Sequence, residues 1–243
     1  MNVLLAGPDY FMEMGWRLMR WQNLLRAMAP SYDKVLVITN EFGIYEDFAE
    51  DASTAYIGEK SMWNAVDAKI TRIEPCKEFC CNAQAPQKFH RYRRHMPSQE
   101  IITIHARSRK LAKERNWSKE KWQELVRLLN KEGYVVASIG TDVHNIGVDL
   151  DFCNVEFKQL CKVIAMSKML IGPSSGPMHL ASIIGTPHLV WTYKKKHNLG
   201  GIAGSNRERY EHVWNPFGCK VTVLDESMWN PSVKEVMDGI EQT

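Results

Sequence analysis

The sequence predicts an α/β protein in which mostly parallel sheets are covered by helices on both faces. Two observations carry this prediction. Short apolar runs rich in β-branched residues recur along the chain, and helical patterns lie between several of them. Strands that alternate with amphipathic helices usually pair in parallel. The expected strands are 3–6, 35–39, 101–105, 135–139, 169–171, 188–191 and 221–224.

Helices are expected where apolar residues recur at steps of three and four, because that spacing forms one stripe along a helix. Each stripe should face a sheet, so its aromatic and methionine side chains are interpreted as core. The stripes are Met14, Leu18, Trp21, Leu25 and Met28; Trp122, Leu125 and Leu129; and Val233, Val236, Met237 and Ile240.

Composition limits the class of protein. The chain has 243 residues, of which 44% are hydrophobic, enough for a packed core in one large domain or two small ones. The formal net charge is only +3, so the chain as a whole does not demand nucleic acid or a membrane surface as partner. No segment approaches the ~18 apolar residues of a membrane span, and residues 1–9 are typical of a strand entering a loop rather than of a signal peptide. We therefore expect a cytoplasmic protein with no stable membrane insertion.

The cysteines predict reduced thiols rather than a disulfide scaffold, because 6 cysteines are few for a chain of this size. Cys76, Cys80 and Cys81 lie near His90 and His95. Their spacing lacks the paired two-residue intervals of a zinc finger or ribbon, so no metal site is expected there.

A second pattern associated with metals is Asp149-Leu150-Asp151, which fits an Asp-x-Asp motif. We interpret it as part of a loop that approaches a helix near 157–166. A three-residue match arises easily by chance, so the prediction is that it binds no metal.

The alternation of strands and helices breaks between about Cys76 and Gln99, where prolines and a basic run, 88–95, occur. This stretch is interpreted as the connection between two domains. The predicted domains are 1–97, an abbreviated N-terminal half, and 98–243, with no fixed-period repeat in either.

The sharpest local signal is the segment 169–182, in which a strand enters a turn of small residues and a helix opens. Pro177 suits the first helical turn because its missing N–H costs nothing there. Ser174, Ser175 and Gly176 are small enough for phosphate oxygens to approach the unpaired N–H groups of the helix start. The alternative is an ordinary strand-to-helix turn capped by serine.

Residues 169–191 resemble the donor-site segment of glycosyltransferase family 9, the group that contains the lipopolysaccharide heptosyltransferases. The shared pattern is a strand, Asp-Ser/Thr-Gly, two residues, His-Leu-Ala and then Gly-Thr-Pro. His179 occupies the histidine of that pattern. This chain has Ser174 where the family has aspartate, so the identity of the donor sugar is not carried over.

The resemblance extends to 115–122, which looks like the family's basic residue, tryptophan and capped helix. It implies a GT-B-like fold, with two Rossmann-like domains and a cleft between them. It also implies that Arg115 contacts donor phosphate. Ser118 is the expected N-cap of the helix that follows.

A general base is needed if an acceptor hydroxyl attacks the sugar carbon, because that hydroxyl must lose its proton. In the fold that the resemblance implies, the first strand-to-helix loop supplies a carboxylate near the acceptor. Glu13 and Asp9 are the candidates, with Glu13 preferred because a carboxylate at a helix start is also favoured by the helix dipole. The alternative for Glu13 is a charge that only stabilises the helix start.

The departing diphosphate needs positive charge or oriented N–H groups, and family members of this kind generally use no metal. Arg107 and Arg115 are singled out from a basic run after the strand that ends near 105. The later segment 194–217 is interpreted as a loop that closes over donor or acceptor, and Arg209 within it is a further donor-binding candidate.

The predicted function is transfer of a sugar, of hexosyl or heptosyl type, from a nucleoside-diphosphate donor to a hydroxyl acceptor. The transfer is expected to invert the anomeric configuration and to use no cofactor beyond the co-substrate. The acceptor would be a glycan, a lipid-linked sugar or a hydroxymethylated base in DNA, the last suggested by the basic and aromatic run 88–95. A non-catalytic protein that binds sugar nucleotides or glycans is the alternative. Sugar-nucleotide epimerases share the fold class, so the fold alone does not exclude them.

Overall fold

The computed structural model describes residues 1–9, 14–53, 69–74, 98, 100–141, 145–199 and 202–243. The chain divides into two compact units. The N-terminal unit is Met1–His90 with Leu199–Gly201, and the C-terminal unit is Arg91–Asn198 with Ile202–Thr243. The predicted boundary at 97/98 adjoins residues outside the described ranges and stays a prediction.

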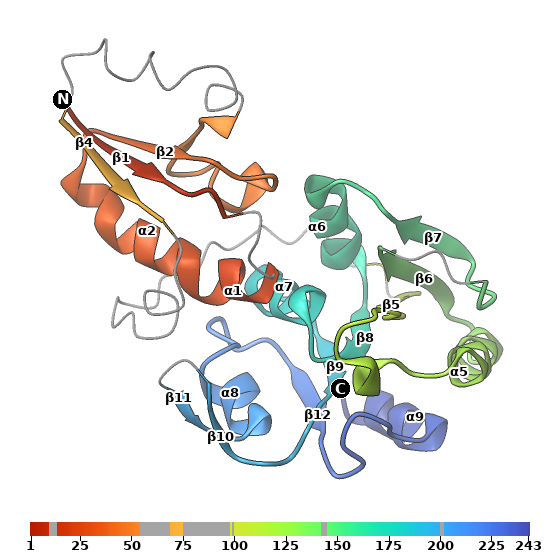
Figure 1. The fold of residues 1–243 in the computed structure, drawn as a ribbon. Coiled ribbons are helices and arrows are strands. Elements are labelled where there is room, and N and C mark those ends of the chain that lie inside the picture. The colour runs from red at the N-terminus through yellow and green to blue at the C-terminus, as the bar shows by residue number, and fades with distance from the viewer. Residues whose placement is uncertain (10–13, 54–68, 75–97, 99, 142–144, 200–201) are drawn as a thin grey trace. The chain divides into compact units, whose positions relative to one another are not determined.

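The N-terminal unit contains a 4-stranded sheet in the order β3-β2-β1-β4, and every described pairing in it is parallel. A helical segment follows β1 (Figure 1). Alternate residues of β1 point to opposite faces, and Val3 and Leu5 pack with Leu36 and Ile38 on one of them. The elements are β1 (Asn2–Ala6), α1 (Met14–Trp16), a π-helical turn (Arg17–Trp21), α2 (Gln22–Met28), a 3₁₀ turn (Ala29–Ser31), β2 (Lys34–Val37), a 3₁₀ turn (Phe42–Ile44), β3 (Glu50–Asp51) and β4 (Lys69–Ile73).

The C-terminal unit contains a 6-stranded parallel sheet in the order β12-β9-β8-β5-β6-β7. A short pair, β10 and β11, forms a separate 2-stranded sheet. The elements are β5 (Ile101–Ile104), a 3₁₀ turn (Lys113–Arg115), α5 (Lys119–Lys131), β6 (Val135–Gly140), β7 (Leu150–Cys153), α6 (Phe157–Met166), β8 (Met169–Pro173), α7 (Gly176–Ile184), β9 (His188–Trp191), β10 (His197–Leu199), β11 (Ile202–Gly204), α8 (Asn206–His212), β12 (Val221–Leu224) and α9 (Val233–Gln242).

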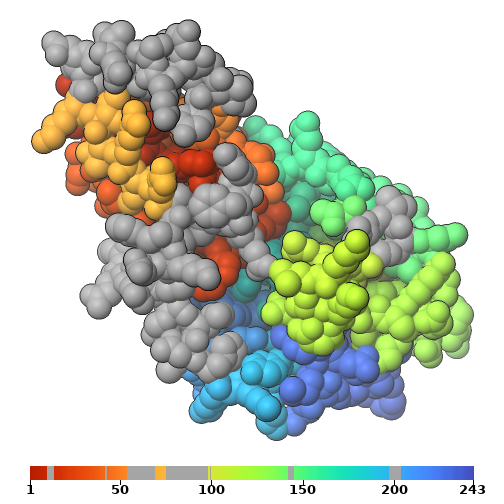
Figure 2. All heavy atoms as spheres, in the orientation of Figure 1, coloured from red at the N-terminus to blue at the C-terminus, as the bar shows by residue number. Residues whose placement is uncertain are grey.

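Two helix pairs cover the C-terminal sheet. α5 packs against α9, and their surfaces adjoin in Figure 2, while α6 packs against α7. Ile102, Ile104 and Ile171 belong to one core cluster with apolar residues of α5 and α9. The intervening Thr103 instead bonds Ser167, which follows α6, with 2.6 Å between the hydroxyl oxygens. Since neighbouring residues of a strand face opposite sides, the two helix pairs lie on opposite faces of the sheet.

The predicted fold class is confirmed for the sheets and helices, and each predicted strand is present. Leu18, Trp21 and Leu25 are buried in the first helical segment, as are Trp122, Leu125 and Leu129 in α5. The strands that the sequence did not predict include β3, β4 and β7, which all lie at sheet edges. An edge strand is half exposed and so lacks the continuous apolar run of a central strand.

The prediction of a loop at Asp149–Asp151 is wrong, because β7 begins at Leu150. The Asp149 and Asp151 carboxylates both accept hydrogen bonds from β6, the neighbouring strand. Asp149 accepts a hydrogen bond from the Val136 N–H at 2.7 Å, and Asp151 accepts one from the Ser138 hydroxyl at 3.0 Å. Among the described residues, no group of His, Cys, Asp or Glu is arranged to hold a metal ion. The cluster Cys76 to His95 lies outside the described residues.

Candidate functional site

Parallel strands carry their functional side chains at their carboxyl ends, which lie along one edge of each sheet. In the C-terminal unit this edge gathers the residues that follow β5, β8 and β9. In the N-terminal unit it gathers those that follow β1 and β2. The two edges are described separately.

The start of α7 is the centre of the C-terminal edge. Ser175 is its N-cap by backbone geometry, yet no side chain caps this helix. The Ser175 hydroxyl instead donates to the Pro173 carbonyl at 2.8 Å and lies 3.0 Å from Nδ1 of His105. The Ser174 hydroxyl pairs with the hydroxyl of Tyr210 at 3.0 Å. The capping role of the alternative interpretation is therefore absent from this helix, and the predicted contact of the two serines with a donor stays a prediction.

This arrangement leaves backbone donors at the helix start. No described residue accepts a hydrogen bond from the N–H of Ser175 or Gly176, and Pro177 has no N–H. Ser175, Gly176 and Pro177 are half-buried and so remain open to solvent. Unpaired amides and the positive end of the helix dipole together favour an anion at this place.

Arg115 supplies a cation beside these amides. Its guanidinium donates a long hydrogen bond of 3.4 Å to the Ser174 carbonyl, and its Nε atom is buried with no hydrogen-bond partner among the described residues. The guanidinium carbon lies 4.5 Å from the centre of the Trp229 ring. No described carboxylate lies within ion-pair distance of this side chain. Arg115 thus lies next to the start of α7, and its predicted contact with phosphate stays a prediction.

Arg107 has a different environment from Arg115. Its guanidinium donates to the Ala112 carbonyl at 2.9 Å, to the Leu111 carbonyl at 2.5 Å and to the side chain of Asn116. These bonds fold the loop after β5 back on itself and fix the backbone that carries Arg115. Its predicted contact with the donor stays a prediction.

His179 lies one turn into α7 within an aromatic cluster. Its ring stacks on Tyr210 with 5.5 Å between centroids and meets the edge of Trp214 at 4.8 Å. Burial, with smaller contributions from the positive charges of His188 and Arg115, lowers the pKa of His179 to about 3. The imidazole is therefore neutral at physiological pH and packs as an aromatic group.

Arg209 is buried in α8, with 1% of its surface exposed. It donates to the side-chain oxygen of Asn206 at 2.9 Å and lies over the Trp214 ring at 5.6 Å. Asn206 in turn donates to the Thr192 hydroxyl, just after β9, at 2.7 Å. This predicted donor-binding residue therefore stabilises the packing of α8, and its predicted contact with a donor stays a prediction.

The N-terminal edge carries carboxylates. Asp9 follows β1 and is fully buried; the hydroxyl of Tyr45 donates to one of its oxygens. Arg17 lies 3.9 Å from the other oxygen and 3.0 Å from the carboxylate of Glu41. Arg17 also donates to the side chain of Asn40 at 2.7 Å. Two carboxylates thus share one buried arginine.

Burial raises the pKa of the Asp9 carboxyl, against the lowering effect of the Tyr45 hydroxyl and of Arg17. Burial also raises the pKa of Glu41, which Arg17 lowers and the nearby Asp9 charge raises. The pKa of Tyr45 lies well above its ordinary value, mainly because of burial and the charge of Asp9. Glu13, the preferred base, lies outside the described residues.

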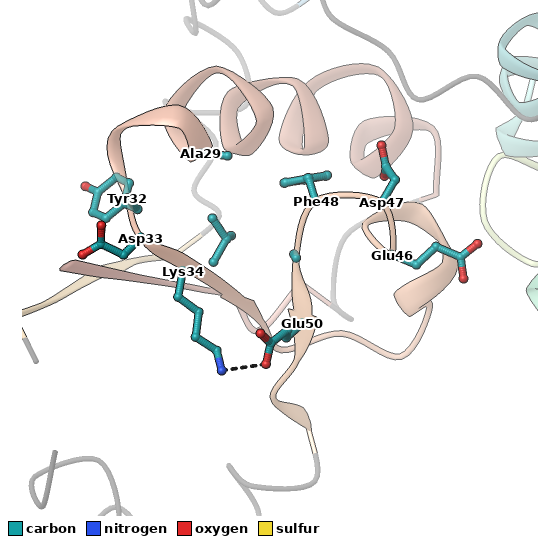
Figure 3. Close-up of a pocket in the computed structure, with 10 residues that line it drawn as sticks. Ala29, Tyr32, Asp33, Lys34, Glu46, Asp47, Phe48 and Glu50 are labelled. Carbon is teal, nitrogen blue, oxygen red and sulfur yellow. Dashed lines mark ion pairs between the residues drawn. The ribbon is translucent and has the colours of Figure 1, made fainter. Parts of the chain in front are cut away.

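Two hollows lined by described residues lie at the opposite, amino ends of the strands. One, of about 350 Å³, precedes β2 and β3, and Lys34 and Glu50 form an ion pair of 2.7 Å across it (Figure 3). The other, of about 770 Å³, precedes β6, β8, β9 and β12 and includes Tyr134 and Lys168. Ligands of open parallel sheets bind at the carboxyl ends, so neither hollow is the candidate site.

Several site residues were not predicted from the sequence. They are His105, Tyr45, Glu41, Arg17 and Trp229. His105 and Glu41 carried a usable signal, because a polar side chain just after a strand lies at the carboxyl edge. Tyr45 and Trp229 gave none, since their partners are distant in the sequence.

Three solved structures are similar to this chain in fold. E. coli ADP-heptose lipopolysaccharide heptosyltransferase II is similar over 100% of this chain and 98% of its own, with a TM-score of 0.66 and 13% identity. A family 9 glycosyltransferase from Veillonella parvula DSM 2008 is similar over 99% and 96%, with a TM-score of 0.61 and 10% identity. E. coli heptosyltransferase WaaC with ADP-2-deoxy-2-fluoro heptose is similar over 100% and 99%, with a TM-score of 0.60 and 13% identity. At these identities the likeness is one of fold.

Among curated protein sequences, none matches this chain significantly. None of the helices in the described ranges has the length and apolar character needed to cross a membrane. A sequence model of glycosyltransferase family 9 (heptosyltransferase) matches residues 72–228, which include the start of α7, Arg115 and His179. The match spans more than half of the chain, and the chain therefore belongs to glycosyltransferase family 9.

Proposed function

We propose that the chain transfers a sugar from a nucleoside-diphosphate donor to a hydroxyl acceptor, with the diphosphate bound at the start of α7. The observation that supports this most is the pairing of an uncapped helix start with Arg115, whose Nε is buried and has no hydrogen-bond partner among the described residues. A diphosphate supplies the acceptor oxygens that both features lack.

The diphosphate leaves the sugar with increased negative charge, which preorganised donors stabilise. Arg115 and the amides of Ser175 and Gly176 supply those donors in this proposal, so no metal ion is required. Activity should persist in excess EDTA. Loss of activity in EDTA that Mg²⁺ or Mn²⁺ restores would reject metal independence while leaving sugar transfer intact.

The acceptor hydroxyl must lose its proton during transfer, and we propose Glu13 as the base. Burial of Asp9 supports this choice, because a fully buried carboxylate that accepts from Tyr45 is not placed to touch an acceptor. Direct attack assisted by one base would invert the anomeric configuration. NMR of the product tests this, and a retained configuration would contradict it.

The first experiment is calorimetric titration with ADP, GDP, UDP and CDP. The wild-type chain should bind at least one of them, and R115M should weaken binding by about 10- to 100-fold, since a charge-assisted contact is lost. Arg127 is exposed on α5, and R127M is the matched control that removes an equal charge elsewhere. If no nucleoside diphosphate binds to the wild-type chain, the proposal fails.

E13Q separates an enzyme from a protein that only binds sugar nucleotides. An enzyme should lose turnover in E13Q while keeping its affinity for the nucleoside diphosphate. Release of nucleoside diphosphate from a panel of sugar nucleotides, with glycan, lipid-linked sugar and hydroxymethylated DNA as acceptors, measures the turnover. A wild-type chain that binds but never releases product would favour the non-catalytic alternative.

A further inference from the structure

We propose that Trp229 is a positioning residue for donor binding, because its ring fixes the guanidinium of Arg115 at the start of α7. This inference rests on the proposed function and names a residue that the sequence did not predict. The key contact is the 4.5 Å separation between the guanidinium carbon of Arg115 and the centre of the Trp229 ring.

The other contacts of Arg115 are too weak to orient it. Its hydrogen bond to the Ser174 carbonyl is long, at 3.4 Å, and its Nε has no partner among the described residues. Arg107 fixes the backbone of the loop up to Asn116 but does not reach the guanidinium of Arg115. An arginine side chain has several rotatable bonds, so a fixed backbone alone leaves its tip unplaced.

Trp229 is itself held firmly. The turn that carries it is fixed by the Pro231 carbonyl, which accepts from the Trp117 indole at 3.0 Å and from the Lys121 amine at 2.8 Å. The ring of Trp229 also stacks on Tyr193, which follows β9, with 6.3 Å between centroids and 10° between planes. The ring is therefore a rigid surface, not a side chain that follows Arg115.

Stacking on a ring suits a phosphate-binding arginine. The guanidinium is planar, and its N–H groups point outward in that plane. An aromatic face attracts the cation without using any N–H group. The Trp229 ring thus takes up no N–H group of Arg115, whereas a carboxylate partner would have bonded to these groups and neutralised the charge.

The test is the affinity for the nucleoside diphosphate that binds best in the titration described above. W229L, which keeps an apolar side chain but removes the ring, should weaken binding by about tenfold. W229F should weaken it by about threefold. Y134L is the matched control, because Lys168 lies 4.5 Å from the Tyr134 ring at the amino ends of the strands. This control should leave the affinity within about twofold of wild type.

A double-mutant cycle distinguishes positioning from general packing. In the R115M background, W229L should change the affinity by less than about twofold, because there is no cation left to place. An equal loss in the wild-type and R115M backgrounds would overturn the proposal.

Fluorinated tryptophans placed at position 229 alone provide a test that does not depend on the folding of W229L. Fluorine weakens the attraction of the ring for a cation while nearly preserving its shape, so the affinity should fall stepwise with the number of fluorines. Unchanged affinity across the series would reject the role of Trp229, provided that R115M still weakens binding. If wild type binds no nucleoside diphosphate, the proposed function has failed instead.

Discussion

Both sheets are parallel, but the side chains at their carboxyl edges have opposite chemistry. The N-terminal edge places two carboxylates, the fully buried Asp9 and the partly buried Glu41, around one arginine. The C-terminal edge presents Arg115, serine hydroxyls and helix-start amides, with no described carboxylate within ion-pair distance of the arginine. The carboxyl ends of parallel strands thus carry carboxylates with raised pKa values in one unit and a cation beside helix-start amides in the other.

The comparison also predicts opposite responses to pH. The raised pKa values of Asp9 and Glu41 mean that the folded N-terminal edge binds protons more readily than the unfolded chain. The stability from these groups is fully present below their unfolded pKa values and is lost as the pH rises through the folded ones. Buried histidines of the C-terminal unit have lowered pKa values and act in the other direction.

Removing the arginine from the N-terminal edge should have the largest effect. R17L leaves the buried Asp9 and the partly buried Glu41 without their shared cation and should lower the free energy of unfolding by about 4 kcal/mol at pH 8. The loss should be smaller at pH 5, where the carboxylates accept protons more readily. Urea unfolding at both pH values measures this loss.

The control is R26L, since Arg26 pairs with the half-exposed Asp47 at 2.6 Å and the loss of this pair should cost about 1 kcal/mol. An R17L loss that is equal at pH 5 and pH 8 would contradict the shared-cation model.

The two edges also differ in how closely neighbouring residues pack against a glycine, Gly7 in one edge and Gly172 in the other. Gly7, after β1, has φ +107, and a Cβ atom there would lie 2.5 Å from the Ile38 carbonyl oxygen. At Gly172, in β8, an added Cβ would lie 3.0 Å from the Cβ of His105, which is a tight contact. We expect G7A to cost about 3 kcal/mol, through both strain and collision, and G172A about 2 kcal/mol, through collision alone. Chemical denaturation of the two variants measures both losses of unfolding free energy. A larger loss for G172A than for G7A would mean that the backbone around Gly7 relaxes more readily to accommodate a Cβ atom.

Acid should weaken the C-terminal unit through His188. This residue is fully buried, and burial lowers its pKa to about 4, with a smaller opposing effect of its hydrogen bond to Thr186. Its contribution to stability is present above pH 6.5 and is lost as the pH falls toward 4. Between pH 7 and pH 5 the wild type should therefore lose about 2 kcal/mol more than H188Q. Parallel pH profiles of the two proteins would show that His188 does not titrate in this way.

The smallest expected effect concerns the hydroxyl pair Ser174 and Tyr210. Y210F removes one partner from a buried hydrogen bond of 3.0 Å and should cost about 1 kcal/mol of stability. Its effect on the affinity for a nucleoside diphosphate should be below about twofold, because the Ser174 hydroxyl faces Tyr210. A marked loss of affinity, with little change in thermal stability, would mean that the hydroxyl of Tyr210 reaches the ligand.

Much of the C-terminal site could be predicted from the sequence because its determinants are local. The apolar run 169–171, the small residues after it and Pro177 are adjacent in the chain, and together they define β8, the turn and α7. The N-cap at Ser118 is equally local, and it accepts from the Lys121 N–H at 3.4 Å.

The rest depends on contacts between distant residues, which a single sequence does not reveal. Tyr45 is 36 positions from Asp9, and Trp229 lies far from Arg115 in the chain. The burial of Arg17 and Arg20 was also missed, because the apolar stripe of that helix does not include them. The helix widens into a π turn at Arg17–Trp21, which enlarges the buried face beyond the stripe.

The Pro231 carbonyl joins the two ends of the C-terminal unit's sequence, and this limits how far the chain can be shortened. It receives hydrogen bonds from Trp117 and Lys121, at the beginning of α5, and it lies just before α9. A shortened chain that stops ahead of this proline would lose α9 and leave the buried indole N–H of Trp117 without its acceptor. Trimming the tail should therefore cause misfolding and proteolysis in the expression host, whereas a purification tag added after Thr243 leaves this junction intact.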